Sequence, residues 1–157
     1  MKRKFQMAHI FVFLSSDFYA RHPISLYPEI EQKKNRPYIQ VTTVIDGIKF
    51  AIPFRSNINH PHAFWTDKAN RCGIDFSKAV VVESDDDIDQ NLTPWIRQNE
   101  FDNLRGKEYR IQTGMRKYIK EYIKAKNNLN DKTNKLLCQK STLQYYESYI
   151  EKIDTTV

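Results

Sequence analysis

The sequence predicts a single α+β domain, residues 1–157, in which helices pack against an antiparallel sheet. Three observations support this class: strand patterns fill the first half of the chain, helical periodicity fills its last third, and an Asp46-Gly47 pair separates two of the strand patterns. Strands first and helices afterwards are typical of α+β folds. With 157 residues, 40% of them hydrophobic, the chain is long enough to bury one core without disulfides.

The N-terminal part predicts a strand and a short helix. Residues 9–14 (HIFVFL) are aromatic and β-branched, which favours a buried strand. Ser15-Ser16-Asp17 supplies N-cap candidates for a short helix that stops near His22-Pro23. Residues 24–35 predict a loop, with or without one helical turn, and the cluster at 33–36 (KKNR) is either a solvated turn or a phosphate contact.

Residues 38–45 and 48–54 predict a β-hairpin. The first segment alternates apolar and polar residues, as a half-buried strand does. Asp46-Gly47 is a strong hairpin signal because both turn residues tolerate positive φ. Paired strands bring their far ends together at the open end of the hairpin. We therefore expect four side chains to converge there: Arg36, Tyr38, Arg55 and Ser56.

The middle of the chain is less regular. Residues 62–67 predict a short helix or a strand extension, and residues 69–73 predict a turn. Residues 74–82 (IDFSKAVVV) predict one further strand. The acidic run at 84–89 predicts a solvated connection or a helix N-terminus, where negative charge is favourable. Its consecutive acids lack the spaced order of a calcium-binding loop.

Helical periodicity begins at Lys107. Apolar residues recur at helical spacing and leave cations on the other faces, so an amphipathic helix is predicted with these residues inward: Met115, Tyr118, Ile119, Tyr122 and Ile123. Residues 127–140 are polar, with a short helix around 135–138. Ser141-x-x-Gln144 predicts a capping box for a last helix. Its inward residues would be Leu143, Tyr146, Ile150 and Ile153.

Charge is distributed unevenly along a chain of net charge +6. Residues 83–102 carry seven acids and one base, whereas residues 105–152 carry twelve Lys or Arg and five acids. A basic face attracts polyanions such as nucleic acid, although a solvated lysine-rich helix explains the same charge.

Lys2-Arg3-Lys4 precedes an apolar patch that is too short for a signal peptide and lacks its cleavage site, so we expect a cytoplasmic protein.

No cofactor or metal is expected. Cys72 and Cys138 lack the spacing of zinc ligands, and the chain has no glycine-rich nucleotide-binding motif.

Arginine, serine, asparagine and histidine side chains that can take part in catalysis or binding gather between residues 50 and 66 (FAIPFRSNINHPHAFWT). Metal-free RNA cleavage needs a proton carrier, for which histidine is suited, and a phosphate ligand, for which arginine is suited. The plainer alternative is that Ser56 and Asn57 cap a turn and the histidines lie at the surface.

Three linked motifs resemble a known family. They are Arg36-Pro37-Tyr38-Ile39, residues 50–58 (FAIPFRSNI) with His60, and residues 73–79 (GIDFSKA). In order and spacing, over roughly residues 9–126, they resemble the toxins of type III toxin-antitoxin systems, the ToxN, AbiQ and CptN endoribonucleases. Residues 141–149 (STLQYYESY) also resemble the end of AbiQ-like members.

The resemblance implies a compact, strongly twisted antiparallel sheet, related to the barrel core of the Kid and MazF toxins, with surrounding helices. It implies metal-independent cleavage of cellular or phage RNA that leaves a 2′,3′-cyclic phosphate and a 5′-hydroxyl. The implied partner is a small repeat RNA, which the toxin cuts into pseudoknot units that then inhibit it in a closed toxin-RNA assembly. Some members of the family act against phage.

Carried over by position, the family's loop serine falls on Ser56 and its strand-opening basic residue on Arg36. ToxN has a lysine just after its Thr-Ser pair, which this chain lacks. We therefore expect the catalytic residues to be Arg55, Ser56 and His60, with proton transfer assigned to His60 and phosphate support to Arg55. RNA contacts are expected from Lys33, Lys34, Arg36, Tyr38, Asn57, Arg116, Lys117, Lys120 and Lys124. The alternatives are a non-catalytic RNA-binding module and a domain that binds an acidic protein partner.

Overall fold

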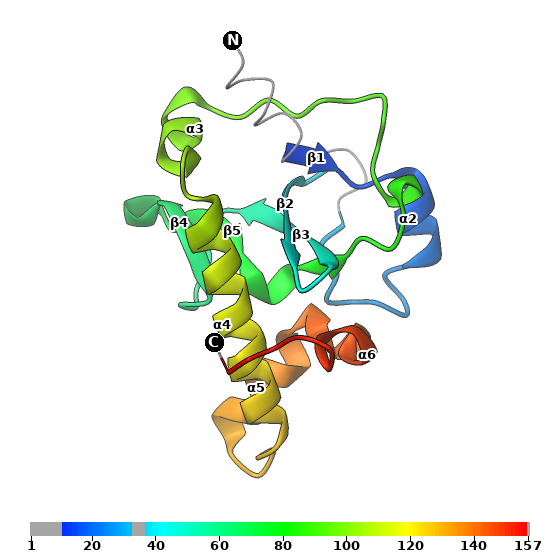
Figure 1. The fold of residues 1–157 in the computed structure, drawn as a ribbon, viewed down its shortest axis with the longest axis vertical. Helices are drawn as coiled ribbons and strands as arrows, with labels where there is room; N and C mark the ends of the chain where they lie inside the picture. The colour runs from blue at the N-terminus through cyan, green and yellow to red at the C-terminus, as the bar shows by residue number, and fades with distance from the viewer. Residues whose placement is uncertain (1–10, 33–36, 157) are drawn as a thin grey trace.

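The computed structural model describes residues 11–32 and 37–156 (Figure 1). Its six strands form an antiparallel sheet in the order β1-β2-β3-β5-β4, with β6 paired to β3. The strands are β1 (Phe11–Phe13), β2 (Ile39–Ile45), β3 (Ile48–Arg55), β4 (Ala63–Asp67), β5 (Cys72–Asp75) and β6 (Val80–Val81). The α+β class is therefore confirmed. Over the described residues the sheet is open, because its end strands β1 and β4 do not pair with each other.

Helices cover the sheet and extend beyond it (Figure 1). They are α2 (Ser16–Arg21), α3 (Gln98–Leu104), α4 (Glu108–Lys126), α5 (Lys132–Lys140) and α6 (Glu147–Ile150). Short 3-10 turns are η1 (Lys68–Asn70), η2 (Phe76–Lys78), η3 (Asp85–Asp87) and η4 (Thr142–Tyr145). Helix α4 contacts β2, β4 and η2, and α5 packs beside α4. No helix within the described ranges is long and apolar enough to cross a membrane.

The predicted hairpin is confirmed. Ile45 pairs with Ile48, and Asp46 and Gly47 between them have φ values of 50° and 82°, as the two-residue turn requires. The pairing continues to Gln40 opposite Pro53. Tyr38 therefore lies near Arg55, and the two side chains interact.

One strand prediction is wrong. Residues 74–82 do not form one strand: β5 ends at Asp75, the 3-10 turn η2 follows, and β6 is separate. The Asp75 carboxylate accepts hydrogen bonds from the backbone N–H of Ser77, at 2.9 Å, and from its hydroxyl. An aspartate that bonds the backbone two residues on favours a turn over a strand. Strands β5 and β6 therefore pair with different parts of β3. Strand β6 pairs with Phe50 and Ala51, and β5 pairs with Phe54 and Arg55.

Other predicted elements are confirmed or refined. Ser15 caps α2, and residues 63–67 take the strand alternative. The acidic run forms η3, whose buried Asp87 pairs with Arg21. Helix α5 is longer than predicted because Asp131 caps it at its start.

The predicted capping box of one last helix is wrong. Ser141 does cap, but it caps the 3-10 turn η4, and Gln144 donates to backbone carbonyls, including that of Ser141 at 2.8 Å. The chain then forms the short helix α6. All four residues predicted to point inward are buried nevertheless: Leu143, Tyr146, Ile150 and Ile153.

The core lies between α4 and the sheet. From α4 it receives Met115, Tyr118, Ile119 and Tyr122, as the periodicity predicts, with Ile123 only half-buried. Strand β3 contributes Phe50, Ala51 and Ile52, all fully buried. Burial of apolar side chains on both sides of this contact is the main force that holds α4 against the sheet.

Gly114 of α4 faces the ring of Phe76 in η2, and a Cβ there would lie 2.7 Å from Phe76 Cζ. Overpacking a buried contact costs about 1–3 kcal/mol, whereas alanine gains up to about 1 kcal/mol over glycine in a helix. We predict that Gly114→Ala lowers the free energy of unfolding by about 1 kcal/mol in urea titrations. Thr113→Ala, at an exposed position of the same helix, is the control and should not destabilise. Equal stability of the two variants would contradict the close contact.

Candidate active site

The candidate site is built on the buried carboxylate of Asp75, at the end of β5. Its Oδ2 accepts from Arg55 Nη1 at 2.6 Å and lies 3.2 Å from His60 Nε2. Its Oδ1 accepts from the hydroxyl of Ser77 at 2.6 Å and from the backbone N–H of the same residue. Three side chains from three segments of the chain are therefore fixed by one fully buried acid.

The fold supplies these positions through strand register and a pinned loop. Arg55 ends β3 opposite Gly73, two residues before Asp75. The loop that follows is held by buried Ile58, whose N–H donates to the carbonyl of Arg71 at 3.1 Å. These contacts return the chain to Asp75, so that His60 reaches the carboxylate.

The Asp75 carboxylate is ionised at neutral pH. Burial raises its pKa, but hydrogen bonds from His60, Ser77 and Arg55 outweigh burial and hold the pKa below its ordinary value. A buried anion with these donors fixes the direction of each donor side chain. The Asp75 carboxylate also holds the positively charged guanidinium of Arg55 at this end of the sheet.

His60 has both ring nitrogens engaged. Its Nδ1 lies 3.0 Å from the backbone N–H of His62, which can only donate, so Nδ1 must accept. The proton of the neutral ring is then on Nε2, which faces Asp75 Oδ2 and lies 3.3 Å from Ser77 Oγ. Because one nitrogen contacts both the acid and the serine, this is not the relay in which a histidine bridges a carboxylate and a nucleophilic serine.

Arg55 is held between two carboxylates. Nη1 binds Asp75, and Nη2 lies 3.3 Å from Glu31 Oε1. The guanidinium side chain keeps 25% of its surface exposed, and the planar fork has five N–H donors. Tyr38 stands beside the pair: burial and Glu31 raise the pKa of its phenol, while Arg55 opposes them.

A second histidine adjoins the first. The ring centroids of His60 and His62 are 5.5 Å apart, and the ring of Tyr118 in α4 is 5.3 Å from that of His62 on another side. His62 Nδ1 lies 3.3 Å from Glu121 Oε2, also on α4. Two imidazoles, a guanidinium and a buried carboxylate thus form one continuous group.

Not all of the predicted site residues join this group. Ser56 and Asn57 form an exposed bend, with Asn57 at a φ of 56°. Arg116 is already bound: its guanidinium contacts Asp46 at 2.8 and 3.1 Å and the carbonyl of Asp154. The positions of Lys33, Lys34 and Arg36 lie outside the described residues.

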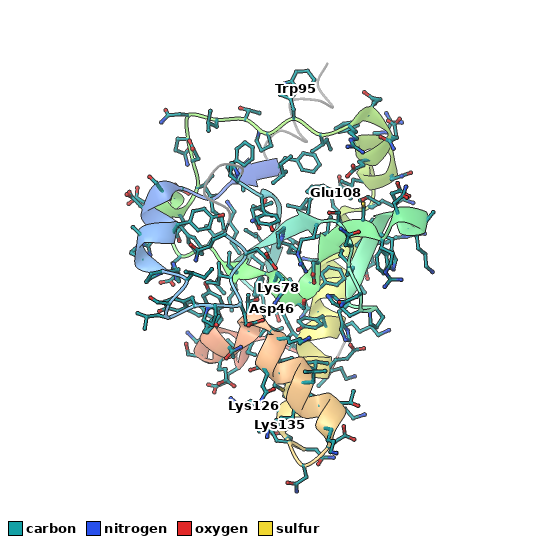
Figure 2. The ribbon with its side chains drawn as sticks, turned by 180° about the vertical axis from the view of Figure 1, so that it is seen from behind. Asp46, Lys78, Trp95, Glu108, Lys126 and Lys135 are labelled. Atoms are coloured by element: carbon teal, nitrogen blue, oxygen red, sulfur yellow. The ribbon has the colours of Figure 1, made fainter. Side chains whose placement is uncertain are left out.

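Three predicted cations remain exposed on α4: Lys117, Lys120 and Lys124. Their spacing of three and four residues puts them on one side of the helix, and Glu121 lies among them. Because Glu121 contacts His62, this row of lysines borders the histidine pair. Lys126, near the end of α4, is paired with Glu147. Figure 2 shows Lys126 and Lys135 in the lower part of the view, away from Glu108 near the start of α4.

Sequence reasoning missed the residue at the centre. Asp75 and Ser77 were assigned to a strand, and Glu31, His62 and Glu121 received no role. The Asp-x-Ser spacing within residues 75–77 is a signal that could have found the turn, because an aspartate followed two residues later by a serine favours a side chain to backbone bond. The contact between His62 and Glu121 joins segments almost sixty residues apart and has no local signal.

Comparison of the chain with protein-family models, curated proteins and solved structures returns no match. Within residues 11–32 and 37–156, no group of three or more His, Cys, Asp or Glu side chains is arranged to hold a metal ion. The geometry of the Asp75 site is therefore the structural basis for assigning a function.

Proposed function

We propose that the protein is a metal-independent endoribonuclease that cleaves RNA to 2′,3′-cyclic phosphate and 5′-hydroxyl ends. The observation that carries the proposal is the convergence of Arg55, His60 and His62 around Asp75, next to a row of exposed lysines. Cleavage by the ribose 2′-hydroxyl needs proton transfer and a cation at the phosphate, and these side chains supply both.

The roles divide by exposure and by partners. Arg55 is partly exposed and binds the scissile phosphate when Glu31 gives way, since a planar guanidinium binds two phosphate oxygens at once. Tyr38 beside it contacts the ribose or a base. Asp75 and Ser77 are buried and hold Arg55 and His60 in place rather than touch RNA.

The family resemblance in the sequence supports a more specific proposal. The protein is the toxin of a type III toxin-antitoxin system, with a sheet core related to the Kid and MazF barrel. It processes its own small repeat RNA into pseudoknot units, which then occupy the site in a closed assembly and inhibit it. In the cytoplasm, toxin that is not inhibited by its RNA antitoxin cleaves cellular or phage RNA and serves in defence against phage.

Expression in cells tests this proposal. We expect growth arrest and fragmented RNA when the protein is expressed alone, and normal growth when the tandem repeat array expected upstream of its coding region is expressed with it. Arg55→Gln and His60→Ala should relieve the arrest at equal protein levels. Absence of toxicity, or toxicity unchanged by both substitutions, would overturn the catalytic assignment.

The α4 lysines should bind RNA without taking part in cleavage. Replacing Lys117, Lys120 and Lys124 with glutamine removes three phosphate contacts, so the slope of log K against log salt should flatten by about 2 for single-stranded RNA. Cleavage at saturating RNA should remain. The slope is measured by titrating labelled RNA at several salt concentrations.

The control for these lysines is a triple variant of α5, in which Lys132, Lys135 and Lys140 become glutamine. It removes the same charge from a different helix. Equal weakening of RNA binding by both triple variants would contradict a specific role for α4, because it would show that net charge alone determines the affinity.

The second candidate function is a non-catalytic RNA-binding module. The observation that favours it is that both nitrogens of His60 and both terminal nitrogens of Arg55 already have protein partners. This candidate predicts tight, salt-dependent RNA binding with intact RNA after long incubation.

A further inference from the structure

We propose that His62, supported by Glu121, is the catalytic base that removes the proton from the ribose 2′-hydroxyl. This inference rests on the proposed RNA cleavage and names a residue for a step that the sequence assigns to His60. The two imidazoles of the site differ in the partners of their ring nitrogens, and of the two only the His62 ring keeps a nitrogen lone pair that has no hydrogen-bond partner among the described residues.

His60 is poorly placed to accept a proton. Its Nδ1 lone pair already accepts the backbone N–H of His62, and its Nε2 carries the proton shared with Asp75. Protonating Nδ1 would break the first bond and place an N–H against another N–H. The geometry therefore makes His60 a positioning residue, which fixes the start of the segment that carries His62.

His62 has the complementary arrangement. Its Nδ1 lies 3.3 Å from the Glu121 carboxylate, which favours the tautomer with the proton on Nδ1. Nε2 then has its lone pair free, and within the described residues no side chain or backbone group forms a hydrogen bond or ion pair with that nitrogen. The side chain is 24% exposed, so RNA can reach it. A carboxylate that orients an imidazole from the far nitrogen is the general arrangement of an activated histidine base.

The surroundings keep this imidazole neutral. The groups that face it are His60 and Asp75 from the sheet side, and Tyr118 and Glu121 from α4. Burial lowers the pKa of His62 below its ordinary value and His60 adds to this, while Glu121 and Asp75 oppose both. A base must be unprotonated before the reaction, so the lowered pKa leaves His62 ready near neutral pH.

The step balances without a metal or cofactor. His62 Nε2 takes the 2′-hydroxyl proton, the 2′-oxygen forms a bond to phosphorus, and the bond from phosphorus to the 5′-oxygen breaks. The departing 5′-oxygen takes a proton from water, and the His62 imidazolium returns its proton to the hydroxide so formed. Arg55 stabilises the extra negative charge on the phosphate in the transition state.

The test is the pH dependence of cleavage of a random-sequence single-stranded RNA by the full chain. General base catalysis contributes at least about 10²-fold, so His62→Gln should lower kcat by about that factor and remove the fall in rate on the acidic side. Glu121→Gln removes a charge that stabilises the protonated imidazole, so the acidic limb should move to lower pH. Glu108→Gln is the control, since Glu108 is an exposed acid about 20 Å away along α4, at 1.5 Å per residue.

Each outcome decides between the hypotheses. If the unmodified protein cleaves RNA and His62→Gln, shown to be folded by its melting curve, keeps both rate and pH profile, then His62 is not the base and the proposed function stands. If Glu121→Gln leaves the acidic limb in place, its support of His62 is refuted. If the unmodified protein binds RNA but never cleaves it, the proposed function itself fails, and this inference fails with it.

Discussion

Asp75→Asn is expected to reduce RNA cleavage by about 10²-fold, because displacements near 1 Å of catalytic groups cost that much. The carboxylate accepts from Arg55, His60 and Ser77 at once. An amide of the same shape has one acceptor oxygen in place of two and presents N–H groups to a donor. Arg55 and His60 would both lose their fixed directions.

The same substitution should destabilise the fold. Removing one partner of a buried ion pair costs about 3–5 kcal/mol, and we expect the lower value, about 3 kcal/mol, because water can reach Arg55. Urea unfolding measures this loss, and Ser77→Ala is the control because it removes one hydrogen bond to Asp75 without a change of charge. Unchanged stability in Asp75→Asn would contradict the central position of this carboxylate.

The lowered pKa of Asp75 also sets how its contribution depends on pH. A carboxyl group whose pKa is lower in the folded than in the unfolded state stabilises the fold fully above its unfolded pKa, about 3.9, and loses that contribution as pH falls through the folded pKa. The stability difference between the parent protein and Asp75→Asn should therefore be constant near neutral pH. It should shrink in acid.

Arg55→Gln is expected to lower kcat by about 10²–10³-fold, the usual effect of removing a donor that stabilises transition-state charge. Arg55→Lys should recover part of this loss, because a lysine restores the charge but not the planar fork that binds two oxygens. The measurement is single-turnover cleavage at saturating RNA, which separates the chemical step from binding.

Arg21→Gln is the matched control for Arg55. Arg21 also pairs with a buried aspartate, Asp87, but at α2 and η3, where His60 and His62 make no contact. Loss of this pair should leave cleavage unchanged. If both arginine variants reduce cleavage equally, Arg55 acts through stability and not at the phosphate.

Local signals were sufficient to predict the elements that position the site. The Asp46-Gly47 turn fixed the hairpin and hence the approach of Tyr38 to Arg55, because a two-residue turn determines the register of its strands. Helical periodicity likewise identified the buried face of α4. These predictions succeeded because each depends on residues close together in the sequence.

The centre of the site could not be predicted in the same way. Residues 74–82 have the composition of a strand, and only the bond from the Asp75 side chain to the backbone at Ser77 interrupts it. The resemblance led to His60 as the proton carrier, and His62 received no role, since only tertiary structure brings Glu121 to the His62 ring. The sequence also predicts Arg116 as an RNA contact on a basic helix, whereas in the structure Asp46 of the hairpin turn forms an ion pair with it.

The most direct test of the central claim is to incubate the purified protein with RNA in the presence of excess EDTA and to analyse the ends of the products. Metal-independent cleavage predicts fragments with 2′,3′-cyclic phosphate and 5′-hydroxyl ends, and no cleavage of an RNA whose scissile riboses carry 2′-deoxy substitutions. Intact RNA under these conditions, or fragments with 5′-phosphate ends, would contradict it.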